Sequence, residues 1–479
     1  MGMFKAMNHR HRYAFGALIL LLILRFYTSF FLFDVPLGYD PGIYRYLFLT
    51  HATGLPPLFM ADIQPWATAH PLGLFILTSP LIKMGIPVDW FLGWIWNLVP
   101  ICLLLLLSHI SAKKWGTGIG LALLIVGLLS QPYFDGFSAM YWKAYVSLAW
   151  MIVTFYLIDK KSPWAAGTAI MTLVTHNQTG LLFALSAGLW WALSVAKHYK
   201  EPKWQKATLG GAVAILIAYL IYAPVVQEAI LIHIKPLLTL RGDNVPAGSF
   251  PPALFYLRMQ PVVFLLGVYG FVMTLHKDRA LSLWHCAALI SAVFVFAKLY
   301  FYNRFFLQLD FFLLPFAAIA LHQLWGKYAS QAARVSIIVI VLVQGYFSYE
   351  VMKLRQPEIS MQSFNLITTL EEMIPAGVNV IALENKSATW MVGWLPDNPV
   401  AGPGLFWLNW TYQQWEKLLL GTDDDRKSLF SSLTGPTYFV ITPEFLQYYG
   451  DKVNGFMNDP CVSPIEGTPL LEVTCTMPR

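Results

Sequence analysis

Long apolar segments alternate with short polar ones through residues 1–349 of the chain. The first apolar segment, 14–33, has about the length that a membrane-spanning helix needs and follows Lys5, Arg10 and Arg12. It ends without a small-residue cleavage site, so we predict a retained helix and not a cleaved signal peptide. The amino terminus is therefore predicted to be cytoplasmic, and the loop of residues 34–71 to lie outside.

Basic residues concentrate in every second turn between the apolar segments. These clusters are Lys113-Lys114, Lys160-Lys161, 197–206, 276–279 and 327–334. Because basic residues favour cytoplasmic turns, the intervening turns are predicted to be external. The external turns are 131–138, 176–179, 226–260 and 298–304.

Residues 72–110 hold two apolar segments where the charge pattern allows one crossing. The first, 72–86, is interrupted by Pro80 and Lys83. As a helix it would reach roughly 22 Å, against about 30 Å of hydrocarbon, so we predict that it lies in the outer interface. The second, 88–110, is predicted to span, which leaves about eleven spans in the chain.

The composition changes after residue 350. Residues 364–373 are predicted to form a helix, and residues 379–383 and 438–442 to form buried strands. Alternating helices and strands predict a small α/β domain, which the odd number of spans places outside. The predicted fold class is an α-helical polytopic membrane protein with a transmembrane domain of 1–349 and an extracytoplasmic domain of 350–479.

The composition agrees with an integral protein of the cell membrane. Hydrophobic residues make up 57% of the chain and charged residues 12%, with a mean hydropathy of +0.55, which excludes an ordinary soluble protein. The net charge of +6 is explained by the cytoplasmic turns, so no nucleic-acid partner is predicted. Cys461 and Cys475 lie in the external tail, where oxidation to a disulfide is a hypothesis.

A group of polar residues directly follows the first span. Tyr39, Asp40, Tyr44 and Arg45 lie within nine residues there. A carboxylate beside hydrocarbon marks a functional group or a structural ion pair. The alternative for Asp40 is a simple turn before Pro41-Gly42.

Around Asp40 the chain resembles the GT-C class of membrane glycosyltransferases, in the branch of protein mannosyltransferases and lipid A aminoarabinose transferases. The matching segments are Leu24-Arg25-Phe26-Tyr27, Gly38-Tyr39-Asp40-Pro41-Gly42-Ile43-Tyr44, His70-Pro71-Leu72-Gly73-Leu74-Phe75 and Lys113-Lys114-Trp115-Gly116. The resemblance implies a GT-C-like fold in which Asp40 is the catalytic base. The family usually has a second acidic residue next, but Pro41 stands here, which departs from a paired-carboxylate metal site.

The resemblance also implies an inverting sugar transfer. A polyprenyl-phosphate sugar would donate, and a lipid, glycan or protein outside the cytoplasm would accept. Asp40 would take the proton of the acceptor hydroxyl, while cations would stabilise the lipid phosphate that leaves. No cofactor is certain and the metal ligands stay unknown, with a divalent cation left open.

Several external residues are further candidates for binding the substrate. Asp135 fits a second acidic position of the family or an Asp-Gly turn, and Lys143 is its ion-pair partner or a phosphate ligand. His176 and Asn177 interrupt an apolar stretch. They form either a tight turn or a contact with the donor or a metal.

The basic candidates lie near other predicted external turns. Arg304 resembles a family arginine at the start of a late span, where it binds phosphate or anchors the helix. Arg241 and Arg258 are candidates of the same kind in the loop of 226–260, and His70 is a candidate at the start of the interfacial helix.

Two other classes of protein stay open. A transporter or lipid flippase would carry its charges near the membrane midplane, whereas the charges here collect in external turns, which favours an interfacial enzyme. A non-catalytic scaffold with the GT-C fold is the second alternative, for which Pro41 is the argument. An oligosaccharyltransferase is disfavoured because Trp190-Trp191 precedes alanine and no Trp-Trp-Asp sequence occurs.

Overall fold

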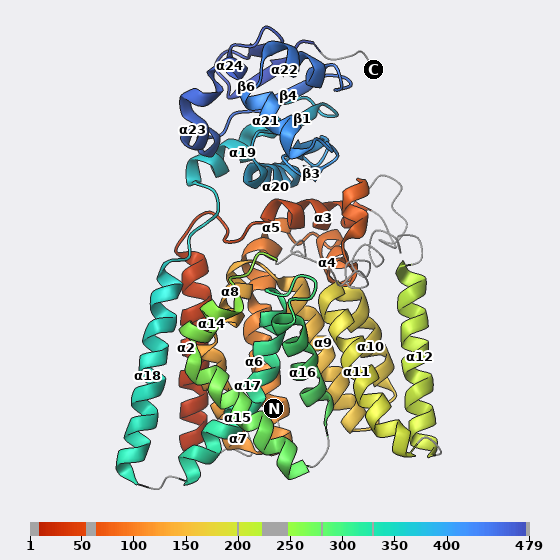
Figure 1. The fold of residues 1–479 in the computed structure, drawn as a ribbon, viewed down its shortest axis with the longest axis vertical. Helices are drawn as coiled ribbons and strands as arrows, with labels where there is room; N and C mark the ends of the chain where they lie inside the picture. The colour runs from red at the N-terminus through yellow and green to blue at the C-terminus, as the bar shows by residue number, and fades with distance from the viewer. Residues whose placement is uncertain are drawn as a thin grey trace. The chain divides into compact units, whose positions relative to one another are not determined.

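The computed structural model describes residues 9–53, 64–198, 201–222, 248–278, 281–327 and 330–475. The chain forms two compact units (Figure 1). The first unit comprises Met1–Phe31, Ala69–Leu74 and Trp94–Arg355. The second comprises Leu32–Thr68, Phe75–Gly93 and Gln356–Arg479. The segment around Asp40 therefore belongs to the same unit as the carboxyl-terminal residues.

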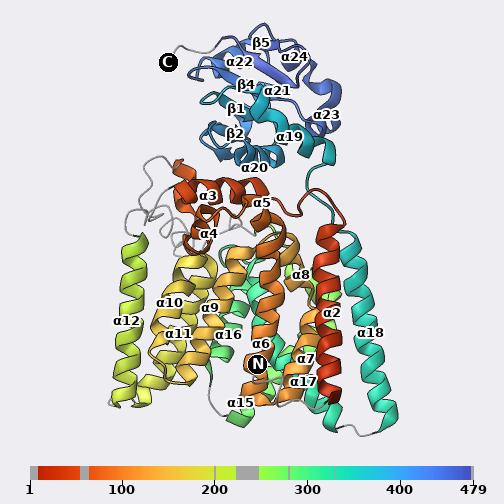
Figure 2. The same cartoon turned by 180° about the vertical axis from the view of Figure 1, so that it is seen from behind.

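The first unit is a bundle of helices, with α17 at its centre and α18 at its periphery. Its helices are α2 (His9–Phe31), α6 (Val99–Trp115), α7 (Thr117–Leu129), α8 (Gln131–Ser138), α9 (Trp142–Asp159), α10 (Trp164–Thr175), α11 (Asn177–His198), α12 (Pro202–Tyr222), α14 (Ala253–Met259), α15 (Pro261–Asp278), α16 (Leu283–Phe296), α17 (Phe305–Lys327) and α18 (Gln331–Lys353). The most apolar window of α17 is 89% buried and that of α18 only 11%. Figures 1 and 2 show α18 beside α2, and α12 beside α10.

Within the described ranges, three helical segments are long and apolar enough to cross a membrane: Val88–Trp115, Phe305–Lys327 and Gln331–Lys353. Two bent pairs raise this number to five if each pair is one span. The pair α7 and α8 bends by 61°, and the pair α14 and α15 by 98°. The expectation of about eleven spans therefore stays a prediction.

The second unit contains a mixed sheet with helices packed around it. Its main elements are α3 (Pro41–Thr53), most of α4 (Gly73–Lys83), α5 (Val88–Trp90), α19 (Met361–Met373), β1 (Asn379–Ala382), α20 (Asn385–Trp394), β2 (Val400–Gly402), β3 (Leu405–Phe406), α21 (Tyr412–Leu420), α22 (Asp423–Phe430), β4 (Thr437–Val440), α23 (Pro443–Tyr449), α24 (Asn454–Met457), β5 (Val462–Pro464) and β6 (Leu470–Val473). The strand order is β3-β2-β1-β4-β6-β5, with β1 parallel to both of its neighbours. The predicted helix and both predicted strands are confirmed as α19, β1 and β4.

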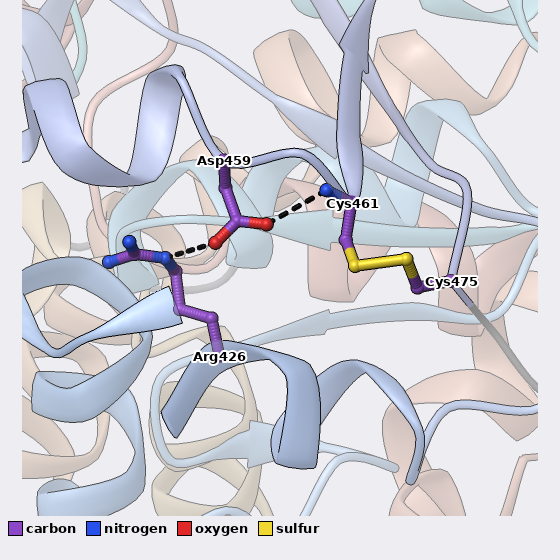
Figure 3. Close-up of a disulfide and its surroundings, with 4 residues drawn as sticks. All are labelled: Arg426, Asp459, Cys461 and Cys475. Carbon is purple, nitrogen blue, oxygen red and sulfur yellow. Dashed lines mark hydrogen bonds and ion pairs between the residues drawn. A yellow bond between two sulfur atoms is a disulfide. The ribbon is translucent and has the colours of Figure 1, made fainter. Parts of the chain in front are cut away.

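A disulfide and a buried ion pair hold the end of the second unit together (Figure 3). Cys461 and Cys475 are bonded with their Cα atoms 5.1 Å apart, as hypothesised from their shared place in the tail. Asp459 accepts hydrogen bonds from Arg426 Nε at 2.5 Å and from the backbone N–H of Cys461 at 2.9 Å. Because both members of the ion pair are buried, each charge depends on the other.

Two facing glycines let α3 approach α20 within the second unit. A Cβ atom on Gly42 would lie 2.2 Å from the carbonyl oxygen of Trp390, and one on Gly393 would lie 2.4 Å from the carbonyl oxygen of Gly42. Thr389 Oγ1 donates to the carbonyl of Tyr39 at 2.8 Å across the same contact. The backbone just before Asp40 is therefore held directly by α20.

We expect Gly393→Ala to loosen this contact, because the added methyl group has no room against the α3 backbone. Overpacking of this kind costs roughly 1–3 kcal/mol, which thermal unfolding of the purified protein would show as a lower Tm. Gly93→Ala is the matched control, since a Cβ atom at Gly93 meets nothing within 4 Å. Equal Tm values for the two variants would contradict the close-contact argument.

Candidate active site

Asp40 lies at the start of α3, and the helix begins there because of Pro41. The carbonyl oxygen of Asp40 accepts the backbone N–H of Tyr44 at 3.0 Å, as at a helix start. Proline suits the first helical position, where its missing N–H has no intrahelical partner and its φ angle is already helical. Pro41 therefore has a structural reason to occupy the place of a second acidic residue. Asp40 itself is half-buried.

Further acidic side chains of the second unit lie around Tyr39. Burial raises the pKa of the Tyr39 phenol well above its ordinary value, and nearby negative charges raise it further. In order of effect, these charges belong to Asp40, Glu384 and Glu358. Tyr39 is therefore a neutral hydrogen-bond donor beside a carboxylate. Glu384 and Glu358 were not predicted from the sequence, because no local pattern connects them to Asp40.

Arg45 and Tyr44 take part in the packing of α3. Arg45 Nε lies 3.1 Å from Asp89 Oδ1, and Arg45 Nη1 donates to the carbonyl of Gly393 at 2.5 Å. The guanidinium carbon also lies 5.2 Å from the ring centre of Trp394. Tyr44 is buried in the same helix. These contacts favour structural roles for both residues, which were candidates for substrate binding.

The first unit places Asp135 in helix α8, so the predicted turn conformation at 131–138 is wrong, whereas its external location stays a prediction. Ser130 caps α8 by accepting the backbone N–H of Tyr133 at 3.1 Å, and Pro132 stands in the first turn. These two helix-start signals prevail over the turn preference of Asp135-Gly136. Every residue of α8 is buried, and Asp135 is only 4% exposed.

Asp135 has partners from α8, from α14 and from the residues that follow α18. Its carboxylate accepts Gln131 Nε2 at 2.8 Å and the Tyr256 hydroxyl at 2.9 Å, and it forms an ion pair with Arg355 at the end of α18. The alternative that Lys143 is the ion-pair partner of Asp135 is therefore wrong, because Arg355 forms that ion pair and Lys143 lies against His70.

A second buried carboxylate joins the two bent helix pairs. Asp310 accepts Ser130 Oγ and Gln260 Nε2, each at 2.5 Å. Gln260 Oε1 in turn accepts the backbone N–H of Gln131 at 2.7 Å. Arg25 of α2 also donates to the carbonyl of Ser130 at 3.0 Å, which supports the predicted structural pairing of this arginine. The polar groups exposed by both helix breaks thus bind each other.

Cationic side chains gather at the start of α9 in the first unit. Lys143 Nζ lies 2.8 Å from His70 Nδ1, so these two predicted residues are brought together. Arg304 lies 5.7 Å from the ring centre of Tyr141, whose hydroxyl is 2.6 Å from Ser249 Oγ. The Arg304 Nε atom is buried and has no hydrogen-bond acceptor among the described residues. An anion is the ligand that this arrangement suits.

The remaining candidates occupy separate places in the first unit. His176 is the single residue between α10 and α11, and its Nδ1 lies 2.9 Å from Thr179 Oγ1. Asn177 begins α11 and is half-buried. Arg258 is exposed on α14, whereas Arg241 lies outside the described residues. In the part of the chain that the structure covers, no three His, Cys, Asp or Glu side chains group as metal ligands would.

No protein-family model and no curated protein sequence matches this chain. Solved structures do match it. The oligosaccharyltransferase AglB of Archaeoglobus fulgidus, in complex with an inhibitory peptide and a dolichol-phosphate, has a TM-score of 0.65 and 13% identity over 92% of this chain and 70% of that chain. The same enzyme in complex with Zn and sulfate has a TM-score of 0.63 and 14% identity. The match covers 93% of this chain and 70% of that chain.

The aminoarabinose transferase ArnT of Cupriavidus metallidurans, in the apo state, has a TM-score of 0.57 and 13% identity. The match covers 97% of this chain and all of ArnT. Both kinds of neighbour belong to the GT-C superfamily. The predicted resemblance is therefore confirmed for the fold. At 13–14% identity, these comparisons show the fold alone.

We expect Asp135→Asn to destabilise the first unit without acting on chemistry directly. The amide keeps the size of the carboxylate but removes the charge that Arg355 and Tyr256 bind, and hydrogen bonds to a charged group contribute roughly 2 kcal/mol each. Thermal unfolding should show a clear drop in Tm. Asp159→Asn is the control, because its ion pair with Lys114 is partly exposed and contributes at most about 1 kcal/mol. A normal Tm for Asp135→Asn would refute the structural role.

Proposed function

We propose that the chain is an inverting membrane glycosyltransferase that transfers a sugar from a polyprenyl-phosphate donor to an extracytoplasmic acceptor. The observation that carries this proposal is the GT-C fold, matched over 92% or more of the chain. The AglB neighbour is in complex with a dolichol-phosphate and an inhibitory peptide. By analogy, the donor here is a lipid phosphate sugar and the acceptor a peptide, glycan or lipid.

Asp40 acts as the general base in this proposal. Its carboxylate takes the proton of the acceptor hydroxyl while the hydroxyl oxygen bonds to the anomeric carbon. The bond from that carbon to the donor phosphate breaks, and the lipid phosphate leaves with the electron pair. Tyr39, kept neutral by burial and by its acidic neighbours, donates a hydrogen bond to the acceptor or the sugar.

The cationic group of the first unit receives the donor phosphate. Arg304 offers a planar pair of N–H donors, and its buried Nε lacks an acceptor among the residues that the structure describes. Lys143 adds a positive charge beside His70. Because the leaving phosphate gains negative charge during transfer, these groups stabilise the transition state more than the ground state. His176 and Asn177 are candidates for contacts with the transferred sugar.

The second unit is assigned to the extracytoplasmic side, with the amino terminus in the cytoplasm. Charge parity independently predicts that 34–71 and 350–479 lie outside, and these two stretches contribute to one compact unit. Helices α3 and α20 pack on each other only if both are on the same side of the membrane. The disulfide of Cys461 and Cys475 also suits an oxidising compartment.

A lipid flippase or transporter is the second candidate function. It is supported by the two broken helix pairs and by the buried charges where they meet, a combination that transporters use for binding at the midplane. A non-catalytic GT-C scaffold is the third. Movement of lipid without sugar transfer would favour the flippase, and neither activity would favour the scaffold.

We expect Asp40→Asn to lower sugar transfer by about 10²–10⁴-fold, because the amide cannot take the acceptor proton. Membranes containing each variant would be given labelled polyprenyl-phosphate mannose or aminoarabinose, and labelled product counted. Asp34→Asn is the matched control, since Asp34 is exposed six residues earlier in the same segment. Unchanged transfer by a folded Asp40→Asn protein would remove Asp40 from the catalytic role.

We expect Arg304→Ala to weaken binding of polyprenyl phosphate by at least about tenfold. A charge-assisted hydrogen bond contributes roughly 1.5–3 kcal/mol, and each 1.4 kcal/mol is a factor of ten. Titration of the purified protein with the lipid measures this change, and Arg334→Ala, which removes an exposed arginine of α18, serves as the control. Equal affinity of the Arg304→Ala and unmodified proteins would refute the phosphate role.

A further inference from the structure

A surface cavity of about 290 Å³ lies on the first unit between the bent pair α14–α15 and the peripheral helix α18. Its lining includes Arg258, Val262, Val339, Val343, Gln344 and Phe347. None of these residues has a role in the function proposed above, and only Arg258 was a candidate for substrate binding from the sequence. The cavity therefore needs an explanation of its own.

The floor of this cavity is an apolar strip along α18. Val339 and Phe347 are eight residues apart, about 12 Å along the helix axis, and both are roughly half exposed. Gln344 is 2% exposed and donates to the carbonyl of Met259 at 2.6 Å, so its amide is occupied by α14. A half-exposed apolar strip on a helix of membrane-spanning length suits a hydrocarbon chain.

Arg258 is the one charged side chain among the residues that line the cavity. Tyr256 lies two residues earlier on α14 and reaches the buried Asp135, so Arg258, about 200° around the helix, points away from that network. Gln344 and Arg355 both contact this part of the first unit, which places α14 beside the carboxyl-terminal half of α18. The apolar strip then runs from Arg258 toward the amino-terminal half of α18.

We propose that this cavity binds one anionic phospholipid of the bilayer. Its phosphate pairs with the exposed guanidinium of Arg258, and the first part of one acyl chain lies along α18 between Phe347 and Val339. A guanidinium next to an apolar strip lowers its free energy by pairing with an anion, and phosphate matches its planar donors. The site is distinct from the donor phosphate site, whose cations stand at the starts of α9 and α17.

Such a lipid would add a connection between α14 and α18 beside the bend at Gln260. The protein itself connects them through Gln344 and Met259, and through Tyr256, Asp135 and Arg355. Occupancy of the cavity would therefore stabilise the 98° bend between α14 and α15. Binding of lipid should then raise the Tm of the purified protein.

Native mass spectrometry and thermal unfolding of the full-length protein in detergent test the proposal, with phosphatidylglycerol and phosphatidylcholine as probes. The unmodified protein should retain several-fold more phosphatidylglycerol and gain Tm from it. Arg258→Gln should remove this preference for the anionic lipid, whereas Arg258→Lys should keep most of it. Val343→Trp should fill the cavity and reduce binding of both lipids.

Leu342→Trp is the matched control, because Leu342 is 65% exposed on α18 but does not line the cavity. The proposal is overturned if Leu342→Trp and Val343→Trp weaken lipid binding equally, or if Arg258→Gln leaves the anionic preference intact. It is also overturned if polyprenyl phosphate displaces phosphatidylglycerol one for one, which would make the cavity part of the donor site. A change from dimer to monomer in Val343→Trp with lipid binding unaltered would assign the cavity to contact between copies of the chain.

Discussion

The first unit depends on hydrogen bonds that offset the cost of burying two carboxylates in an apolar bundle. An ionised carboxylate without partners is too costly for such surroundings, so Asp135 and Asp310 require donors close by. All the donors are side chains: Gln131, Tyr256 and Arg355 donate to Asp135, and Ser130 and Gln260 donate to Asp310. Ser130 and Gln260 lie at the two helix breaks, and Gln260 also accepts the backbone N–H of Gln131, which has no partner within α8. The polar network therefore joins the two bends to each other.

This network also explains how a peripheral helix stays attached. Helix α18 buries little of its apolar surface, so packing alone holds it weakly. Its polar contacts are specific: Gln344 and Ser348 donate to carbonyls of Met259 and Leu129, and Arg355 pairs with Asp135. Because Gln356 begins the carboxyl-terminal part of the second unit, Arg355 also fixes the point at which the chain leaves the bundle.

Local sequence patterns predicted helices and strands. They did not predict contacts between residues that are far apart in the sequence. The helix α19 and the strands β1 and β4 follow from composition and periodicity over a few residues, and the disulfide follows from the place of both cysteines in the predicted external tail. The turn at Asp135 was wrong because a capping serine and a proline before it start a helix. Arg355 pairs with Asp135 across 220 positions, and no periodic pattern connects them. The acidic neighbours of Tyr39 were missed for the same reason, since tertiary packing alone brings them together.

The burial of the network bears on where chemistry can occur. Asp135 has three donors, Asp310 has two, and both carboxylates are buried, so a substrate would have to displace these partners to reach them. A transport site has to exchange partners as it opens to each side, whereas these hydrogen bonds hold the two bends together. Rigid support suits an enzyme whose reacting groups lie elsewhere. That reasoning favours Asp40, which stands at a helix start in the second unit, over either buried carboxylate as the base.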